Sequence, residues 1–503
     1  MASDVCFLLE GTFPYVSGGV SSWVYQLIRD LPGLKFSLVY LGASESVDQE
    51  YKYPIPENVV EIREVYLQGG VPIPPRPPPR TLGPQDWARL RTFLAGIREG
   101  DVEPFAPLVL ETFRPGRDLI QELLYAEGSW EFLKEQYARL AEEPSFLDYF
   151  WTWRFSHLPI LRTLSAGLPE ARCYHAVSTG YAGLLAAAAR VRTGAPLILT
   201  EHGIYTRERR IEIARASWIH DEEELSVSAR ESFFKDWWIR MFAGMSRIVY
   251  RHADVIVTLY EGNRQAQISD GADPAKIRII PNGVDILPFT GLRPVDAPAD
   301  PPTVALVGRV VPIKDVKTFI RAAKILHAES PGIRFQVLGP LDEDPDYFRD
   351  CEILARMLGL EGVVQFLGKV DLARHFAGVD CLVLTSVSEG QPLVVLEAFA
   401  AGIPVVATDV GACRNLVEGA GPEDRALGEA GIITSIGKPD QTAAAVRRIL
   451  SEPGTYLSMA RAGRERAAAS YRLETVSAQY QALYEQLPLL AELKSRGADG
   501  GGV

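Results

Sequence analysis

Short β-branched segments alternate with turns and helical stretches along almost the whole chain, and this alternation limits the fold more than any other feature. A repeat of this kind forms parallel β-sheets that are covered by helices, so we predict an α/β fold. Eleven strands are expected, at residues 5–9, 36–41, 59–65, 172–177, 196–200, 254–259, 303–307, 334–338, 363–367, 380–385 and 404–408.

The chain has 503 residues, which is too many for one hydrophobic core and suggests two domains. Residues 287–302 are rich in Pro, Asp and Ala without helical or strand periodicity, as is typical of a linker. We therefore predict an N-terminal domain at 1–286 and a C-terminal domain at 303–470. A last helix at 471–490 is expected to lie apart from the domain that it follows, and the tail at 491–503 to be disordered.

Two segments interrupt the first domain. The proline run within residues 69–84 predicts an extended surface loop. Residues 85–168 have a helical pattern with many aromatic residues and look like an insertion. Aromatic residues of this kind usually pack in a core, although surfaces that bind carbohydrate also use them.

Composition excludes several classes of protein. The net charge of −12 disfavours binding to nucleic acid or to anionic lipid surfaces, and no apolar run is long enough to span a membrane. Five widely spaced cysteines and an N-terminus without a secretory signal predict a cytoplasmic protein with reduced thiols. The acidic residues at 342–346 lack the glycine and the final glutamate of a calcium loop, so no metal site is predicted.

The segment that follows the strand at 380–385 contains Glu389, Pro392 and Glu397 and predicts an anion site. We expect a helix to begin at Pro392, because proline is tolerated in the first turn. The free amides of Leu393 and Val394 would then point out of the helix N-terminus toward a diphosphate.

Three further segments follow predicted strands, where ligands bind in parallel sheets. Arg309 and Lys314 come after the strand at 303–307 and could neutralise a diphosphate leaving group. Gly18 and Gly19 come after the first strand, where a bare backbone can approach a ligand closely. His202 could hydrogen-bond a sugar, and His175 is placed similarly, at the end of the strand at 172–177.

Taken in chain order, these motifs resemble those of the family 4 retaining glycosyltransferases with the GT-B fold. The resemblance is carried by the glycine pair at 18–19, Pro281-Asn282-Gly283-Val284-Asp285, the Gly-Arg-x4-Lys motif at 308–314 and Glu-x7-Glu at 389–397. Residues 10–23 and 199–210 also resemble the PelF-like branch of that family, whose members are cytoplasmic glycosyltransferases of Pel exopolysaccharide biosynthesis. The resemblance implies two Rossmann-like domains with parallel sheets that face each other across a cleft, with the final helix crossing back to the N-terminal domain.

The resemblance also implies a role for each motif. Arg309 and Lys314 would bind the pyrophosphate, Glu397 the ribose, and the amides of Leu393 and Val394 the phosphate. The transferred hexose would be held by Glu389, by the backbone of Gly390 and Gln391, and by His202. Gly18 and Gly19 would close on the donor, and the backbone around Lys369 and Val370 would bind the base.

The function implied is transfer of a hexose from a UDP-sugar, preferably UDP-glucose, to a growing polysaccharide with retention of configuration. UDP-GalNAc and UDP-GlcNAc are the rival donors, and the UDP-sugar is a co-substrate, so that no cofactor is expected. The basic run at 207–210 and the aromatic insertion are expected to meet the acceptor or inner-membrane synthase and export proteins, which could recruit the protein to that membrane. Two alternatives stay open: a non-hydrolysing UDP-sugar epimerase, and a catalytically silent subunit that binds nucleotide sugar.

Overall fold

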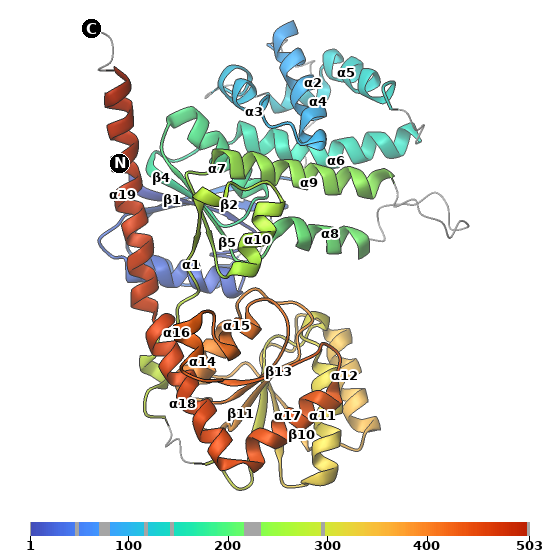
Figure 1. Cartoon of the computed structure of the whole chain (residues 1–503). Helices are drawn as coiled ribbons and strands as arrows, with labels where there is room; N and C mark the ends of the chain where they lie inside the picture. The colour runs from blue at the N-terminus through green and yellow to red at the C-terminus, as the bar shows by residue number, and fades with distance from the viewer. Residues whose placement is uncertain are drawn as a thin grey trace. The chain divides into compact units, whose positions relative to one another are not determined.

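The computed structural model describes residues 2–45, 50–69, 81–114, 119–140, 145–215, 233–292 and 297–499. The chain forms two compact units, one made of Met1–Ile279 with Tyr480–Val503 and the other of Ile280–Gln479 (Figure 1). The first unit thus ends before the predicted linker at 287–302. Hydrogen bonds explain the difference: the Asn282 amide donates to the Gln391 side-chain oxygen at 2.6 Å, and the Val284 amide donates to the Tyr471 carbonyl at 2.7 Å.

The first unit is built on a seven-stranded parallel sheet in the order β3-β2-β1-β4-β5-β6-β7. Its strands are β1 (Ser3–Glu10), β2 (Phe36–Gly42), β3 (Val59–Tyr66), β4 (Ala171–Ala176), β5 (Leu197–Glu201), β6 (Val255–Thr258) and β7 (Ile277–Ile279). The helices beside them are α1 (Gly19–Asp30), α7 (Tyr181–Thr193), α8 (Tyr205–Arg215), α9 (Phe233–His252) and α10 (Glu261–Ser269). Helix α7 is fully buried from Ala182 to Ala189, because its small side chains let it lie close to β1 and β4.

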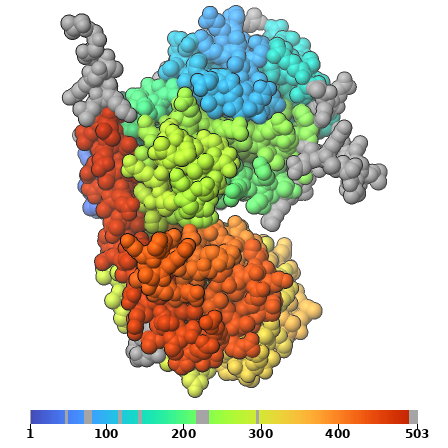
Figure 2. Space-filling view, in the orientation of Figure 1, coloured from blue at the N-terminus to red at the C-terminus, as the bar shows by residue number. Residues whose placement is uncertain are grey.

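The segment expected to be an insertion is helical. It contains α2 (Pro84–Glu99), α3 (Phe105–Pro107), the π-helical turn Leu108–Thr112, α4 (Ile120–Tyr125), α5 (Glu127–Tyr137) and α6 (Phe146–Ser165). Helix α6 packs on α7, and α2 packs on α9, so the insertion shares the core of the first unit. Its aromatic residues divide between core and surface, since Tyr149 and Trp153 are buried whereas Trp151 and Phe155 are exposed. Helices of the insertion, in blue and cyan, form part of the outer surface of this unit (Figure 2).

The second unit is built on a six-stranded parallel sheet in the order β10-β9-β8-β11-β12-β13. Its strands are β8 (Thr303–Val307), β9 (Arg334–Leu338), β10 (Val364–Gly368), β11 (Cys381–Leu384), β12 (Val405–Thr408) and β13 (Gly431–Thr434). Its helices are α11 (Val316–Glu329), α12 (Pro345–Met357), α13 (Leu372–His375), α14 (Leu393–Ala401), α15 (Cys413–Glu418), α16 (Pro422–Arg425), α17 (Pro439–Ser451) and α18 (Pro453–Ser470). Short 3-10 turns lie at Pro274–Lys276, Leu287–Phe289, Pro312–Lys314 and Phe376–Gly378.

All eleven predicted strands are present, within two residues of the expected ends. The pattern missed β7 and β13, which are three and four residues long. β7 is too short for an apolar pattern to stand out, and β13 contains only two large apolar residues, Ile432 and Ile433.

The last helix, α19 (Leu473–Asp499), is shared between the units, with its residues from Tyr480 onward in the first. The Tyr484 hydroxyl is hydrogen-bonded to Nδ1 of His175 at 2.7 Å, which ties this part of the helix to β4. The helix extends past residue 490, where disorder was expected, because Ala, Glu, Leu, Lys and Arg at 491–496 favour helix. Residues 500–503, and residues 70–80 of the proline-rich segment, lie outside the described residues. In the part of the chain that the structure describes, no helix is both long and apolar enough to cross a membrane.

Candidate functional site

The loops that follow β8 and β11 contact each other in the second unit. These strands are parallel neighbours, so their carboxyl ends lie at one edge of the sheet. The Val387 amide donates to the Ile313 carbonyl at 2.9 Å, and the Thr385 hydroxyl donates to the carbonyls of Lys314 and Asp315 at 3.1 and 2.9 Å. The loop containing Lys314 and the loop containing Glu389 therefore form one site.

Lys314 and Glu389 form an ion pair in this site. Lys314 Nζ lies 2.5 Å from Glu389 Oε1, and the two side chains are only 19% and 11% exposed. The Ser386 hydroxyl donates to the same Oε1 at 2.6 Å. Oε2 of Glu389 has no hydrogen-bond donor among the described residues, so one carboxylate oxygen stays available to a ligand.

Arg309 lies in the first of these loops but is held loosely. Its guanidinium pairs with Glu343 Oε2 at 2.8 Å, and its side chain is 48% exposed. Ion pairs this exposed contribute little to stability, so Arg309 can exchange Glu343 for a phosphate at small cost. The neighbouring Asp344 caps α12 by accepting from the Tyr347 amide at 3.0 Å. Across the described residues, no three His, Cys, Asp or Glu side chains are grouped to hold a metal ion.

The helix after Glu389 begins one residue later than predicted. Pro392 is the N-cap of α14, because its ψ of 116° lies outside the helical region, and Leu393 is the first helical residue. The Val395 amide donates to the Pro392 carbonyl at 3.1 Å, whereas the amides of Leu393 and Val394 have no acceptor within the described part of the chain. Two free amides at a helix N-terminus suit an anion.

Glu397 lies on α14, one turn after Leu393, and is partly buried. None of the residues that the structure describes donates a hydrogen bond to its carboxyl group or pairs with it. Burial raises the pKa of this carboxyl to about 7. A carboxyl group in this position is suited to accept hydrogen bonds from a ligand diol.

The carbonyl groups of Gly390 and Gln391 are already hydrogen-bonded within the fold. The Gly390 carbonyl accepts from the Ala412 amide at 2.8 Å, and the Gln391 carbonyl accepts from the Asn282 side chain at 3.2 Å. The Gln391 side-chain oxygen is also taken, by the Asn282 amide. Any contact of these two residues with a hexose is thus left mainly to their N–H groups.

Gly411 was not predicted but shapes the same loop. A Cβ atom at this position would lie 2.2 Å from the Glu389 carbonyl oxygen and 2.3 Å from that of Gly390, and φ is +55°. Only glycine fits such a close approach in this conformation. In the sequence, Gly411 is marked only by its position three residues after the strand predicted at 404–408.

Lys369 and Val370 follow β10, two strands from β8 at the same edge of the sheet. Lys369 is exposed and Val370 is half-buried. The Gly368 carbonyl before them accepts from the Gly339 amide at 2.8 Å, which ties this loop to the end of β9. Their position is open to a ligand that extends along the sheet edge.

Gly18 and Gly19 begin α1 in the first unit. Gly18 is the N-cap with an extended backbone, and its amide contacts the Tyr53 hydroxyl at 3.3 Å. A Cβ atom at either glycine would meet no atom within 4 Å. The packing of the described residues therefore does not require glycine here, which leaves close approach of a ligand as a reason for the pair.

His202 and His175 differ sharply in their surroundings. Both ring nitrogens of His202 are buried without a partner among the described residues, and Trp23 packs edge-on against the ring at 4.7 Å. Burial lowers the pKa of His202 to about 4, so the imidazole is neutral at physiological pH. His175 is fully buried, and its nitrogens are bonded to Tyr484 at 2.7 Å and Thr200 at 2.8 Å. We therefore assign His175 a structural role in place of the substrate contact that we expected.

The carboxyl groups of the buried Glu201 and the half-buried Glu10 support the loops of the first unit. Glu201 accepts hydrogen bonds from the Tyr250 hydroxyl at 2.7 Å and the Gln267 side chain at 2.9 Å. Glu10 accepts from the Tyr205 hydroxyl at 3.1 Å. Burial raises the pKa of both carboxyl groups. Glu10 and Glu201 lie in the motifs at 10–23 and 199–210, but the sequence around them does not indicate which residues bond to them.

The basic run after β5 is only partly free. Arg207 and Arg210 are exposed on α8. Arg209 lies over the Tyr205 ring at 5.0 Å and pairs with Glu212 at 2.7 Å. A ligand of this surface would therefore meet Arg207 and Arg210 first.

Comparisons with known proteins agree with this division of the chain. Residues 3–275 match the family described as a domain of unknown function, DUF3492, and residues 301–452 match the family Glycosyl transferases group 1. The second match covers the residues of the candidate site in the second unit, from Arg309 to Gly411.

Curated relatives include a MMP alpha-(1->4)-mannosyltransferase from Mycolicibacterium hassiacum, 28% identical over 59% of this chain and 66% of that protein. A D-inositol 3-phosphate glycosyltransferase from Kineococcus radiotolerans is 34% identical over 43% of this chain and 54% of that protein. The chain thus spans about half to two thirds of the length of these curated relatives.

Among solved structures, the sucrose-phosphate synthase of Thermosynechococcus elongatus aligns with a TM-score of 0.57 at 19% identity, covering 96% of this chain and 98% of that one. Anabaena HepE, solved with UDP and glucose, aligns with a TM-score of 0.57 at 16% identity, covering 96% and 100%. These similarities show the fold.

Two Rossmann-like units with parallel sheets, and a phosphate-compatible site at the strand ends of the second, define a protein of the GT-B fold class. Its second unit carries a glycosyl transferases group 1 domain. The chain belongs to the family described as the domain of unknown function DUF3492.

Proposed function

We propose that this protein is a retaining glycosyltransferase that transfers a hexose from a UDP-sugar to a growing exopolysaccharide of the Pel type. UDP-glucose is the preferred donor, with UDP-GalNAc and UDP-GlcNAc as rivals. The relatives and the group 1 domain support sugar transfer, and HepE structures contain UDP, glucose or UDP-glucose. The PelF-like motifs at 10–23 and 199–210 support the acceptor class.

The observation that carries this proposal is the arrangement around the Lys314–Glu389 pair. A half-buried cation, two free helix-terminal amides and a carboxyl group without a partner lie in the linked loops after β8 and β11 and on α14. These groups match a phosphate and a diol, which are the two recognition features of a nucleoside diphosphate. No resident metal or cofactor is part of the proposal.

In the proposed reaction, Lys314 and the amides of Leu393 and Val394 stabilise the negative charge on the departing UDP. Glu389 Oε2 accepts a hydrogen bond from a hydroxyl of the hexose. The acceptor hydroxyl attacks the anomeric carbon from the face that UDP leaves, and its proton passes to a phosphate oxygen of UDP. One C–O bond breaks and another forms on the same face, so the anomeric configuration is retained without a covalent enzyme intermediate.

The proposal is tested by calorimetry with UDP-glucose, UDP-GalNAc, UDP-GlcNAc and a GDP-sugar, followed by turnover with and without a polysaccharide acceptor. We expect one UDP-sugar to bind most tightly, and NMR of the product to show the anomeric configuration of the donor. Isomerisation of the sugar without acceptor would instead identify an epimerase, and binding without turnover would identify a silent subunit. Preference for the GDP-sugar would refute the assignment of the base.

A further inference from the structure

The helical insertion of the first unit contains a cavity, open to solvent on one side, that the proposed reaction does not use. Its volume is about 360 Å³, within the range of small-molecule sites, and helices α4, α5 and α6 line it. Most of the lining is apolar or aromatic, including Leu124, Leu133, Phe150 and Trp153. The interior is therefore suited to a hydrocarbon body.

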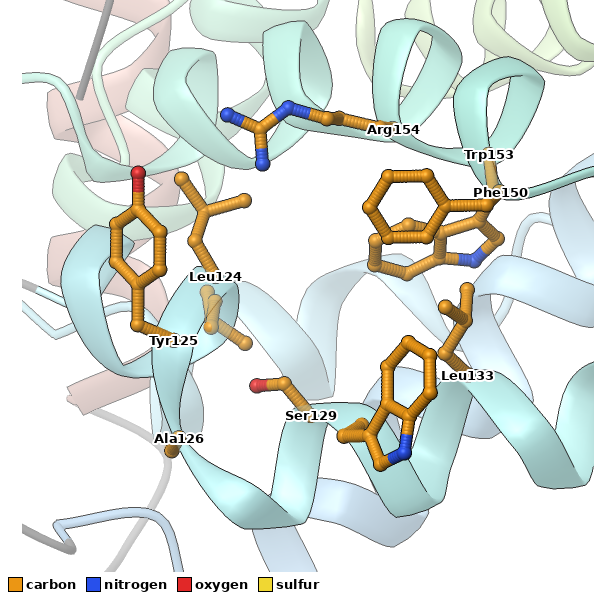
Figure 3. A pocket seen from close by; sticks show the side chains of 10 residues that line it. Leu124, Tyr125, Ala126, Ser129, Leu133, Phe150, Trp153 and Arg154 are labelled. Atoms are coloured by element: carbon orange, nitrogen blue, oxygen red, sulfur yellow. The ribbon is translucent and has the colours of Figure 1, made fainter. Parts of the chain in front are cut away.

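The polar groups of this cavity lie on one side (Figure 3). The Arg154 guanidinium and the Tyr125 ring lie there together with Leu124, whereas Phe150, Trp153 and Leu133 lie on the other side. Arg154 is the one charged residue in the lining. It has no hydrogen-bond or ion-pair partner among the described residues, unlike Arg139 in the turn after α5, which pairs with Glu135 at 2.6 Å.

An unpaired guanidinium at one side of a mostly apolar cavity complements a ligand with the opposite charge. Arginine binds carboxylate or phosphate through charge-assisted hydrogen bonds, which are strongest where water is partly excluded. A neutral hydrocarbon would leave this charge unmatched, and a cationic amphiphile would be repelled.

Apolar surface continues outward from the cavity along α6. Leu147, Trp151 and Phe155 recur every four residues on one face of the helix and are 63%, 45% and 52% exposed. The Trp151 ring lies 5.2 Å from the ring of Phe150, which lines the cavity, and 5.7 Å from that of Phe155. A chain longer than the cavity could follow this aromatic path.

A membrane surface is a poorer match than a single molecule. The chain carries a net charge of −12, which disfavours anionic bilayers, and the site is a concave cavity with one cation. We propose that this cavity binds a single-chain anionic amphiphile, with the carboxylate or phosphate on Arg154 and the hydrocarbon body against Phe150, Trp153 and Leu133. The site does not depend on the proposed reaction, because none of its residues belongs to the donor site.

Calorimetry on the full chain tests this proposal with decanoate, decanol and decyltrimethylammonium, each below its micelle-forming concentration. Tryptophan fluorescence gives a second readout, because Trp130 and Trp153 line the cavity. We expect saturable binding of decanoate, with decanol and the cation weaker by about tenfold or more.

Three variants locate the site. Arg154→Ala should weaken decanoate binding by about tenfold, to the level of decanol. Ala126→Leu adds a side chain at the cavity wall and should abolish binding. Arg139→Ala removes a paired arginine outside the cavity and should leave binding unchanged. Circular dichroism melting verifies that each variant folds, and the comparison of ligands on the unaltered chain does not depend on any variant.

The proposal is overturned if decanoate shows no saturable binding, or if the three amphiphiles bind equally. It is also overturned if decanoate affinity survives Ala126→Leu, or if a folded Arg154→Ala variant binds decanoate as the unaltered chain does. Binding to vesicles of anionic phospholipid without binding to monomeric decanoate would assign the surface to a membrane instead.

Discussion

Lys314 and Arg309 supply the positive charge of the candidate donor site, but the fold holds them differently. Lys314 is mostly buried against Glu389, whereas Arg309 forms an exposed pair with Glu343. A charge in a partly dehydrated site acts on a leaving phosphate more strongly than one in water. Lys314 is therefore expected to contribute more to transfer.

Replacement of each residue by alanine tests this order. We expect Lys314→Ala to lower kcat/KM for the UDP-sugar by about 100-fold to 1000-fold, and Arg309→Ala by about tenfold, because solvent screens the more exposed charge. Steady-state kinetics measure kcat/KM for each variant, and calorimetry measures its affinity for UDP. Wild-type turnover in the double variant would refute the role of both cations.

The buried carboxyl group of Glu397 predicts a pH dependence of donor binding. Its pKa is raised to about 7, and hydrogen bonds from a ribose diol are stronger to the ionised form. UDP affinity should therefore rise about tenfold between pH 6 and pH 8, as the ionised fraction grows. Calorimetry at several pH values measures this trend, which Glu397→Gln should remove.

The same group predicts the opposite trend for the stability of the free protein. The folded state holds this proton more tightly than the unfolded chain, whose carboxyl has a pKa of 4.5. Stability should thus fall by about 1 to 3 kcal/mol as pH rises from 4.5 through 7. Denaturant unfolding of the unaltered chain and of Glu397→Gln would show this; a stability difference between the two that does not change with pH would contradict the raised pKa.

The loop that connects Glu389 to α14 depends on the backbone of a neighbouring turn. Its backbone packs directly on Gly411, where an added Cβ would lie 2.2 Å from the Glu389 carbonyl oxygen. The turn before α15 therefore positions a donor-site residue without touching any ligand itself.

Gly411→Ala should displace this loop and weaken UDP-sugar binding by about tenfold or more, since backbone atoms cannot move aside as a flexible side chain would. Gly437→Ala is the matched control, because Gly437 also has a positive φ, +66°, but open space around its Cβ position. Both variants should lose about 1 kcal/mol of stability from the left-handed backbone. Equal donor affinity in the two variants would show that the close approach of Gly411 does not matter.

At the scale of the whole molecule, the groups suited to the phosphate and the diol lie in the second unit, and the basic run of α8 lies in the first. Because Arg209 is paired with Glu212, Arg207 and Arg210 are the residues of this run that can meet an acceptor. Variants in each unit can therefore test whether the second unit binds the donor and α8 of the first unit binds the acceptor.

The double variant Arg207→Ala and Arg210→Ala should lower polymer synthesis by about tenfold while UDP affinity stays within twofold, since no donor residue is altered. Arg447→Ala with Arg448→Ala, on α17 of the second unit, removes the same charge and serves as the control. Polymer yield and calorimetric UDP binding are compared in both. Parallel loss of UDP binding in the first variant would contradict the division of labour.

The sequence by itself determined the local elements and the residues that follow them. Short apolar runs predicted eleven of the thirteen strands found among the described residues. The sequence also placed Arg309, Lys314 and Glu389 beyond strand ends and Glu397 in the helix that follows. Such predictions succeed because the strands of a covered parallel sheet are buried on both faces and therefore appear as short continuous apolar runs. The carboxyl ends of parallel strands also lie at a common edge.

Only the tertiary structure decided which distant groups meet. Asn282 bonds to Gln391 and so moves the boundary to residue 280, and Tyr484 of the last helix bonds to His175 and makes it structural. Gly411 likewise matters only because its turn packs on Glu389. These pairs are separated by 22 to 309 positions, and local patterns carry no information about contacts at such separations. The partners become neighbours only when the sheets and helices pack.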